Sequence, residues 1–179
     1  MWYKIDPDEF ECNYTPTSYP RTTYLLSKTQ WGTSHKTWRE CCSNVDDSHA
    51  ELIFMENRKC SEIVNRRTNT PCHITWYLSW TPCGLCAKDI INFLEEDPNV
   101  TLEILAARVY RPYDQRNQKG LKDLELYLGS RVQISIMDQN DYQYCWGTFV
   151  DHQGERYFPP DAGDIQFHSR RLDSMLYNF

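Results

Sequence analysis

The sequence has no long apolar run and no excess of basic charge. Its hydrophobic stretches stay far below the roughly 20 residues that a helix needs to cross a bilayer, so no membrane span is expected. The first ten residues include Asp6, Asp8 and Glu9, and no secretory leader is expected from so acidic a start. The net charge of −6 over 179 residues argues against a general basic surface for nucleic acid.

A regular cysteine framework, internal repeats and linkers are also absent. The eight cysteines follow no fixed spacing, and a chain of this size can bury a core without disulfides, so a reducing compartment, cytoplasm or nucleus, is expected. Cys41 and Cys42 fall in an expected strand, which favours core or edge positions for both. Without linkers or composition shifts, residues 1–179 are expected to form one domain.

Two short segments contain the residues that indicate chemistry. The first contains His49 and Glu51, and the second contains Cys83 and Cys86 after a proline. Two cysteines three residues apart project from one face of a helix and can share a metal ion. One imidazole and two thiols match a catalytic zinc site, which keeps a fourth position for water. His49, Cys83 and Cys86 are therefore the predicted ligands of Zn²⁺.

Both segments carry signals of a helix start. Thr81 suits an N-cap and Pro82 the first helical position, while Ser48 and Glu51 have the spacing of a capping box. The positive end of a helix would then favour the thiolate form of the cysteines. Zinc lowers the pKa of bound water to about 7, and Glu51 is the predicted general acid and base that moves its protons.

Each of these patterns has an alternative. The Cys-x-x-Cys spacing after Trp80 is also typical of redox pairs, but a redox pair leaves the His-x-Glu segment unexplained. A structural zinc site would need a fourth protein ligand, for which Cys60, Cys72 and His73 are candidates. Glu51 could also serve only to cap its helix.

A local basic stretch stands out from the acidic chain. Residues 108–122 contain five basic residues against one acid, whereas residues 123–179 contain nine acids against four lysines and arginines. Tyr110 and Tyr113 alternate with arginines there, and aromatic rings beside phosphate-binding side chains suit single-stranded nucleic acid. The alternatives are a solvated helix face for the basic residues and a core position for Tyr110.

The expected fold class is α/β, with parallel strand pairs in one sheet and helices on its faces. The expected order is a helix over 6–12, strands over 22–28 and 35–42, a helix from 48 to about 65, a strand over 73–80, a helix over 82–97, a strand over 100–109, a helix over 117–128, a strand over 131–137, and helices over 141–150 and 164–177. Because the cysteine helix directly follows a strand, the site is expected at the carboxyl edge of the sheet.

Four segments together resemble the AID/APOBEC polynucleotide cytidine deaminases. They are residues 49–51, 79–86, 106–110 and 144–150, and the Ser79-Trp80 pair separates this family from tRNA adenosine deaminases. Residues 5–11 and 113–121 are similar to the apolipoprotein B mRNA-editing branch. The resemblance implies a cytidine-deaminase-like three-layer fold, with a central mixed five-stranded sheet flanked by about six helices.

The resemblance also implies an activity, a cofactor and a set of site residues. The activity is zinc-dependent deamination of cytosine to uracil in single-stranded DNA, with RNA as a further substrate. A free-cytidine deaminase and a non-catalytic nucleic-acid-binding protein with structural zinc are the alternatives, and either a monomer or a weak dimer is compatible with the sequence. The resemblance implies that His49, Cys83 and Cys86 are the zinc ligands and that Glu51 is the proton shuttle. Around the base, it implies that Trp80 and Tyr110 flank the ring and that Ala50 and Thr81 contact it through the backbone. Of the remaining implied residues, Thr23 and Asn44 lie in substrate-contacting loops, Arg108 lies at the pocket mouth, and Arg111 and Tyr113 belong to the loop that selects the 5′ neighbour.

Overall fold

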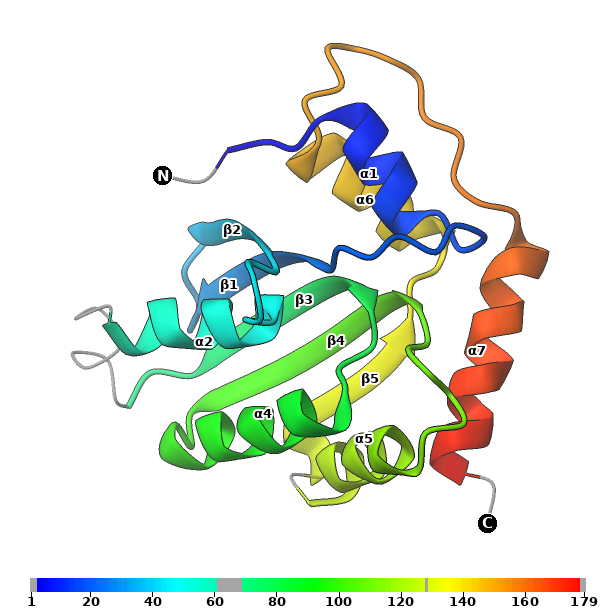
Figure 1. Cartoon of the computed structure of the whole chain (residues 1–179). Coiled ribbons are helices and arrows are strands. Elements are labelled where there is room, and N and C mark those ends of the chain that lie inside the picture. Colours follow the sequence, from blue (N-terminus) through cyan, green and yellow to red (C-terminus); the bar gives the residue numbers. More distant parts are fainter. Residues whose placement is uncertain (1–2, 61–68, 128, 178–179) are drawn as a thin grey trace.

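A mixed five-stranded sheet forms the centre of the computed structural model, which describes residues 3–60, 69–127 and 129–177 (Figure 1). The strands are β1 (Tyr24–Trp31), β2 (Thr37–Ser43), β3 (Cys72–Trp80), β4 (Val100–Arg108) and β5 (Val132–Ile136), in the spatial order β2-β1-β3-β4-β5. β1 is antiparallel to β2 and β3, whereas β3, β4 and β5 are parallel to one another. The expected mixed five-stranded sheet is confirmed.

Helices cover both faces of the sheet. α2 (Ala50–Cys60), α4 (Gly84–Glu96) and α5 (Gln115–Tyr127) lie on one face, and α1 (Pro7–Tyr14) and α6 (Gln139–Phe149) lie on the other (Figure 1). α7 (Ala162–Tyr177) packs against α5 and β5. The described part of the chain thus has six α-helices, in agreement with the expected number. α4 and α5 connect successive parallel strands, the arrangement that a parallel sheet requires.

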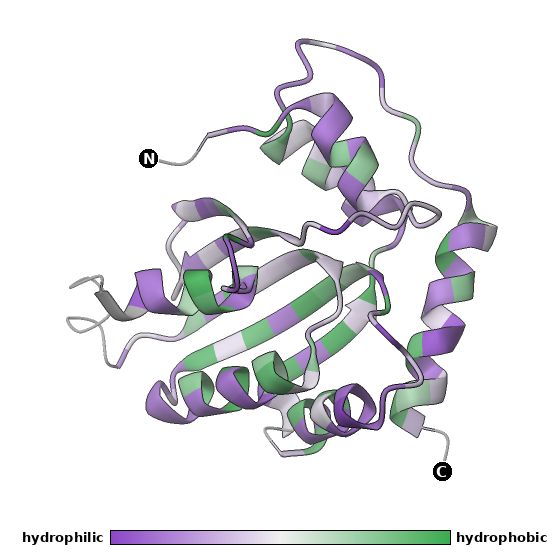
Figure 2. Ribbon diagram, in the orientation of Figure 1, coloured by the Kyte–Doolittle hydropathy of each residue, from purple (hydrophilic) through white to green (hydrophobic). Residues whose placement is uncertain are grey.

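Two apolar clusters hold these layers together. The larger joins the sheet to α2, α4, α5 and α7 and includes the edge-to-face pair Phe54 and Trp76. The smaller joins the sheet to α1 and α6 and includes Phe10 and Tyr142. The interior strand β4 is rich in hydrophobic residues, whereas much of α5 is polar (Figure 2). This pattern follows from burial of a parallel strand on both faces, while a surface helix buries only one stripe.

Most expected elements are present with shifted ends. The hairpin strands run to Trp31 and Ser43, and Cys41 and Cys42 lie on the edge strand β2, half-buried and buried. The helix expected over 48–65 begins at Ala50, and its last part, from residue 61 on, lies outside the described residues. Over the described ranges, no helix combines the length and apolarity needed to span a bilayer.

The topology brings the predicted site segments to one edge of the sheet. Trp80 ends β3 and pairs with Arg108, which ends the neighbouring parallel strand β4. The segment after Trp80 leads directly into α4, and the segment after Arg108 leads into α5. The carboxyl ends of parallel strands meet at one edge, where ligands usually bind in such sheets.

Candidate active site

The three predicted zinc ligands converge at the N-terminal ends of α2 and α4. The Nδ1 atom of His49 lies 3.1 Å from the Cys86 sulfur and 3.7 Å from the Cys83 sulfur. One ligand atom from each of the three residues lies within 4.8 Å of the other two. A group of one imidazole and two thiols at this spacing can hold a metal ion, and the softness of the sulfur ligands favours zinc.

The helix starts differ from those expected. α4 begins at Gly84 with Cys83 as its N-cap, and the Cys83 sulfur accepts a hydrogen bond from the Cys86 backbone N–H at 3.5 Å. The N-cap and first-turn roles expected of Thr81 and Pro82 are therefore wrong by two residues. α2 likewise begins at Ala50, so His49 and not Ser48 precedes the first helical residue. Both helices thus begin directly after a candidate metal ligand.

Hydrogen bonding between the two cysteines shifts their pKa values in opposite directions. Hydrogen bonding with the Cys86 thiol and with backbone N–H groups lowers the pKa of the Cys83 thiol to about 5, although burial acts against it. Hydrogen bonding with Cys83 and burial together raise the pKa of the Cys86 thiol. The lowered pKa favours the thiolate form of Cys83, the form that binds a metal ion.

Glu51 lies beside the ligands with an unsatisfied carboxylate oxygen. The residue is 3% exposed, and its Oε2 atom is buried without a hydrogen-bond partner. Burial raises the pKa of Glu51 from 4.5 to about 7, against opposing hydrogen bonds and the charge of His49. An unpaired buried polar atom costs free energy unless another group satisfies it. A metal-activated water would satisfy it, so the residues present fit a zinc site with an open position.

Two of the three candidate fourth ligands of a structural site lie at the far end of β3. Cys72 and His73 begin β3, and Trp80, near the ligand cluster, ends it. At about 3.3 Å per residue, the two ends of this strand are roughly 25 Å apart. The side chain of Cys60 lies outside the described residues. Among the described side chains, the only metal-ligand group of this kind is the set of three residues.

A cavity of about 320 Å³ opens directly onto the ligand cluster and Glu51. Thr23, Asn44, Trp80, Thr81, Tyr110 and Arg111 line it together with His49, Glu51 and Cys83, and all nine are predicted site residues. Pro20 and Arg21 also line it and were not predicted. They precede β1 by a few residues and carry no motif, so only the folded chain reveals them.

Hydrogen bonds to the backbone hold the residues at the cavity edge. The Thr23 N–H donates to Asn44 Oδ1 at 2.8 Å, and the Asn44 N–H donates to the Thr23 carbonyl at 3.1 Å. The Tyr110 N–H donates to the Thr81 hydroxyl at 2.9 Å. Segments far apart in sequence are thereby fixed to one another around the cavity.

Two aromatic rings form adjacent sides of this cavity. Trp80 and Tyr110 meet edge to face, with ring centroids 6.0 Å apart. Tyr110 is half-buried and reaches two cavities, so the alternative of a core position is not what the structure shows. The arrangement leaves apolar ring surface facing a space beside the ligand cluster.

Arg108 does not lie at the pocket mouth, and that expectation is wrong. Its side chain is fully buried, and its guanidinium lies 4.3 Å from the centre of the Trp80 ring. It donates hydrogen bonds to the carbonyls of Asn13 and Thr15 and to the Ser18 hydroxyl. Burial lowers the pKa of Arg108 to about 10, which still leaves it charged at neutral pH. The sequence pattern did not distinguish a buried arginine from an exposed one.

Two further residues that were predicted to contact the substrate fall outside the lining of the cavity. Ala50 is fully buried, and its backbone contact with a base stays a prediction. Tyr113 is 83% exposed and does not line the cavity. Within the basic stretch, Arg116 pairs with Asp114 and Lys119 pairs with Asp123. The stretch is therefore less positive in space than in sequence.

A second cavity of about 590 Å³ adjoins the first. His49, Cys83, Tyr110 and Arg111 line both cavities. The second extends between α4 and α5, where Lys88 and Lys119 are among its lining residues. The Arg111 guanidinium lies 5.3 Å from the centre of the Tyr110 ring, on the boundary between the two spaces. An exposed cation and an aromatic ring at such a boundary can bind a single nucleic-acid strand that passes from one cavity to the other.

Comparisons with known proteins agree with this site. A family model described as APOBEC4-like, AID/APOBEC deaminase, matches residues 13–152. The mouse C->U-editing enzyme APOBEC-1 is 42% identical over 158 residues, which cover 87% of this chain and 66% of that enzyme. The human C->U-editing enzyme APOBEC-1 is 38% identical over 149 residues, covering 83% and 61%.

A relative with a different printed activity is also similar. The cat DNA dC->dU-editing enzyme APOBEC-3H is 31% identical over 161 residues, which cover 88% of this chain and 80% of that enzyme. The chain spans slightly less than two thirds of the length of the APOBEC-1 relatives. By the match of the family model to most of its length, the chain belongs to the AID/APOBEC deaminase family.

Proposed function

We propose that this protein deaminates cytosine to uracil in single-stranded polynucleotides, with DNA as the first substrate and RNA as the second. One observation carries the proposal: the buried, unpaired carboxylate oxygen of Glu51 lies beside a group of one histidine and two cysteines at an open cavity. When bound there, zinc would supply a water molecule activated for attack on the base.

Glu51 would move the protons that this hydrolysis requires. The water oxygen bonds to C4 of cytosine, and the bond between C4 and the exocyclic nitrogen breaks. Glu51 carries one proton from the water to N3 of the ring and the second to the departing amine, which leaves as ammonia. Its position two residues after His49 keeps it within reach of the water without making it one of the metal ligands.

The shape of the cavity supports a base extruded from a strand. Trp80 and Tyr110 offer ring surface on adjacent sides, and stacking on aromatic rings contributes about 1–3 kcal/mol per base. Extruding a base from a duplex costs a few kcal/mol, so single strands are the more favourable substrate. The adjoining cavity and Arg111 give the flanking nucleotides a place beside the base.

The test compares Glu51→Gln with Glu56→Gln on cytosine-containing DNA and RNA oligonucleotides. Both variants remove one carboxylate from α2, but Glu56 is exposed and lies farther along the helix. Loss of an acid-base group lowers rates by about 10²–10⁴, so Glu51→Gln is expected to lose uracil formation while keeping its zinc. Full activity of Glu51→Gln would contradict the proposal. A wild-type protein that binds oligonucleotides without deaminating them would favour a non-catalytic binding protein, and a preference for free cytidine would favour a nucleoside deaminase.

A further inference from the structure

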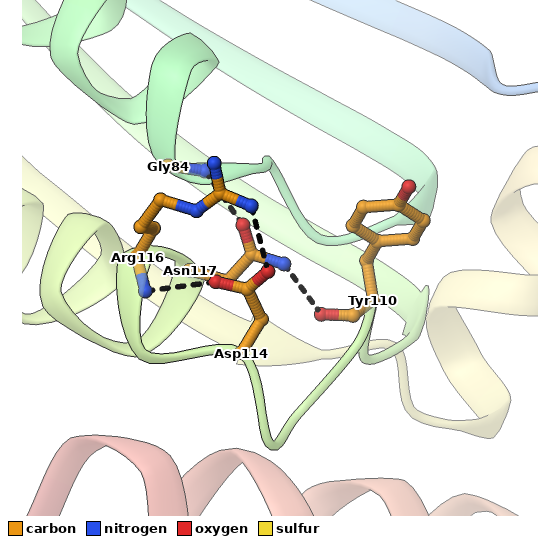
Figure 3. Close-up of polar contacts among 5 residues, drawn as sticks. All are labelled: Gly84, Tyr110, Asp114, Arg116 and Asn117. Atoms are coloured by element: carbon orange, nitrogen blue, oxygen red, sulfur yellow. Dashed lines mark hydrogen bonds and ion pairs between the residues drawn. The ribbon is translucent and has the colours of Figure 1, made fainter.

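The amide of Asn117 connects the metal-site helix to the aromatic side of the cavity. Asn117 lies in the first turn of α5 and is 5% exposed. Its Oδ1 atom accepts a hydrogen bond from the Gly84 N–H at 2.9 Å, and its Nδ2 atom donates to the Tyr110 carbonyl at 3.4 Å (Figure 3). Gly84 is the first residue of α4 and follows Cys83 directly. One side chain therefore touches both the turn that holds the sulfurs and the backbone of Tyr110.

Close packing prevents α4 and α5 from shifting independently at this point. A Cβ atom on Gly120 would lie 2.9 Å from the Gly84 Cα, and one on Gly84 would lie 2.6 Å from the Arg116 carbonyl oxygen. Such contacts exist only because both residues are glycines. The backbones of the two helices are thus in direct contact beside Asn117, and its position is set by both.

Tyr110 is held from its other side as well. Its N–H donates to Thr81, so both polar backbone groups of Tyr110 bind side chains rather than a strand. The next residue, Arg111, has a φ of 39°, a left-handed conformation that is unfavourable for a residue with a side chain. Strained loops of this kind persist only where neighbouring bonds hold them.

Asp114 fixes the end of the same loop. Its N–H donates to the Arg111 carbonyl at 3.1 Å, and its carboxylate accepts from the Arg116 N–H at 2.8 Å (Figure 3). The loop from Tyr110 to α5 is therefore bound at its end by Asp114, while the amide of Asn117 binds its first residue. Between these two attachments lies the strained residue at the cavity boundary.

We infer that Asn117 is a positioning residue, which sets the location of the Tyr110 ring relative to the metal-binding turn. The inference rests on the proposed function, because Tyr110 matters only if its ring packs against a base. A change in the distance between the ring and the ligand turn would weaken stacking on the base, which contributes about 1–3 kcal/mol, and would so weaken substrate binding. A bond that joins the ring's backbone directly to the ligand turn keeps that distance fixed.

Asn117→Asp separates the two bonds of this residue. The carboxylate still accepts from the Gly84 N–H, but it cannot donate to the Tyr110 carbonyl. Gln118→Glu is the matched control, since it makes the same chemical change one residue later and releases only the Pro112 carbonyl, which Gln118 Nε2 binds at 2.7 Å. Pro112 lines neither cavity.

We expect Asn117→Asp to raise KM for an oligonucleotide at least about fivefold, the equivalent of about 1 kcal/mol of lost stacking, with zinc content unchanged. Partial misfolding would lower kcat but leave KM unchanged. Hydrogen exchange is expected to quicken over residues 110–113 and to stay slow over 84–86. A KM equal to that of Gln118→Glu, together with exchange over residues 110–113 as slow as in the wild type, would overturn the inference.

A second variant and the exchange measurement cover the cases in which Asn117→Asp does not fold or the wild type is inactive. If Asn117→Asp does not fold, Asn117→Ala replaces it, and exchange is then expected to quicken over both segments because both bonds are lost. If the wild-type protein forms no uracil, the proposed function fails by itself. The exchange pattern then decides whether Asn117 fixes Tyr110 to the metal-site helix, and slow exchange over residues 110–113 in the variant would refute that.

Discussion

Replacement of Arg108 by methionine tests whether this arginine stabilises the fold or binds substrate. Methionine keeps much of the apolar side chain but removes the guanidinium and its three hydrogen bonds. The Thr15 carbonyl keeps bonds from the backbone and hydroxyl of Ser18, whereas the Asn13 carbonyl loses its charged donor. The cost therefore concentrates on the last turn of α1, which contains Asn13.

The magnitude follows from these contacts. Two hydrogen bonds from a charged donor to carbonyls contribute about 1.5–3 kcal/mol each, and stacking of a buried cation on Trp80 contributes about 2 kcal/mol. The desolvation of a buried charge, which costs several kcal/mol, is avoided in the variant. We expect Arg108→Met to lower the free energy of unfolding by about 2–4 kcal/mol, as measured by urea denaturation.

Oligonucleotide binding at several salt concentrations provides the second assay. A residue that contacts a phosphate changes the slope of log K against log salt by about 0.7 on single strands. Buried Arg108 should leave this slope unchanged. Arg111→Met is the matched control, because Arg111 is exposed and lines both cavities. Its variant should unfold within about 0.5 kcal/mol of the wild type and show the reduced slope. Wild-type stability of Arg108→Met, together with a reduced salt slope, would refute this reasoning.

Three further predictions concern packing, pH and metal. Gly120→Ala should destabilise the protein by about 1–3 kcal/mol in urea denaturation, because its Cβ would lie 2.9 Å from the Gly84 backbone. Gly147→Ala is the control and should be neutral or stabilising, because Gly147 lies in α6 with open space around it. Equal effects of the two substitutions would contradict the packing argument. Burial lowers the pKa of His168 from 6.5, and its neutral ring accepts a hydrogen bond from the Val109 N–H. The unfolded state therefore binds the proton more tightly, so stability should be full above about pH 6.5 and fall as the pH drops below it. In melting curves, His168→Gln should lose this fall in stability at low pH. An unchanged pH profile would exclude His168 as the cause of the fall. Zinc at 100 times its dissociation constant should raise the free energy of unfolding by about 2.7 kcal/mol. A chelator should reverse the accompanying rise in melting temperature. A melting temperature that zinc does not change would argue against a zinc site in the folded state.

The metal-ligand set could be predicted because its signals are local. Cys83 and Cys86 lie within one helical turn, and the spacing of His49 and Glu51 places a ligand beside an acid on the same short segment. Such spacings survive an error of two residues in the helix start, which is the error that the structure corrects at Thr81 and Pro82. The order of strands and helices could be predicted for a similar reason, since period and turn residues act over a few positions.

The surroundings of the ligands could not be predicted in the same way. Arg21, Asn44 and Tyr110 meet at one cavity although they lie on separate segments of the chain. No spacing rule relates residues that only strand order and helix packing bring together. The glycine contact between α4 and α5 is likewise visible only as a distance between backbones.

Sequence alone thus determined the fold class, the ligand residues and the acid beside them, because each depends on short-range spacing and residue chemistry. Only the tertiary structure decided which charges are available to a substrate. Arg108 and Arg111 stand three residues apart and look alike in sequence, yet one is buried against Trp80 and the other lies open at the cavity. The physical reason is that β4 carries Arg108 into the core, while the chain after its end turns outward before α5 begins.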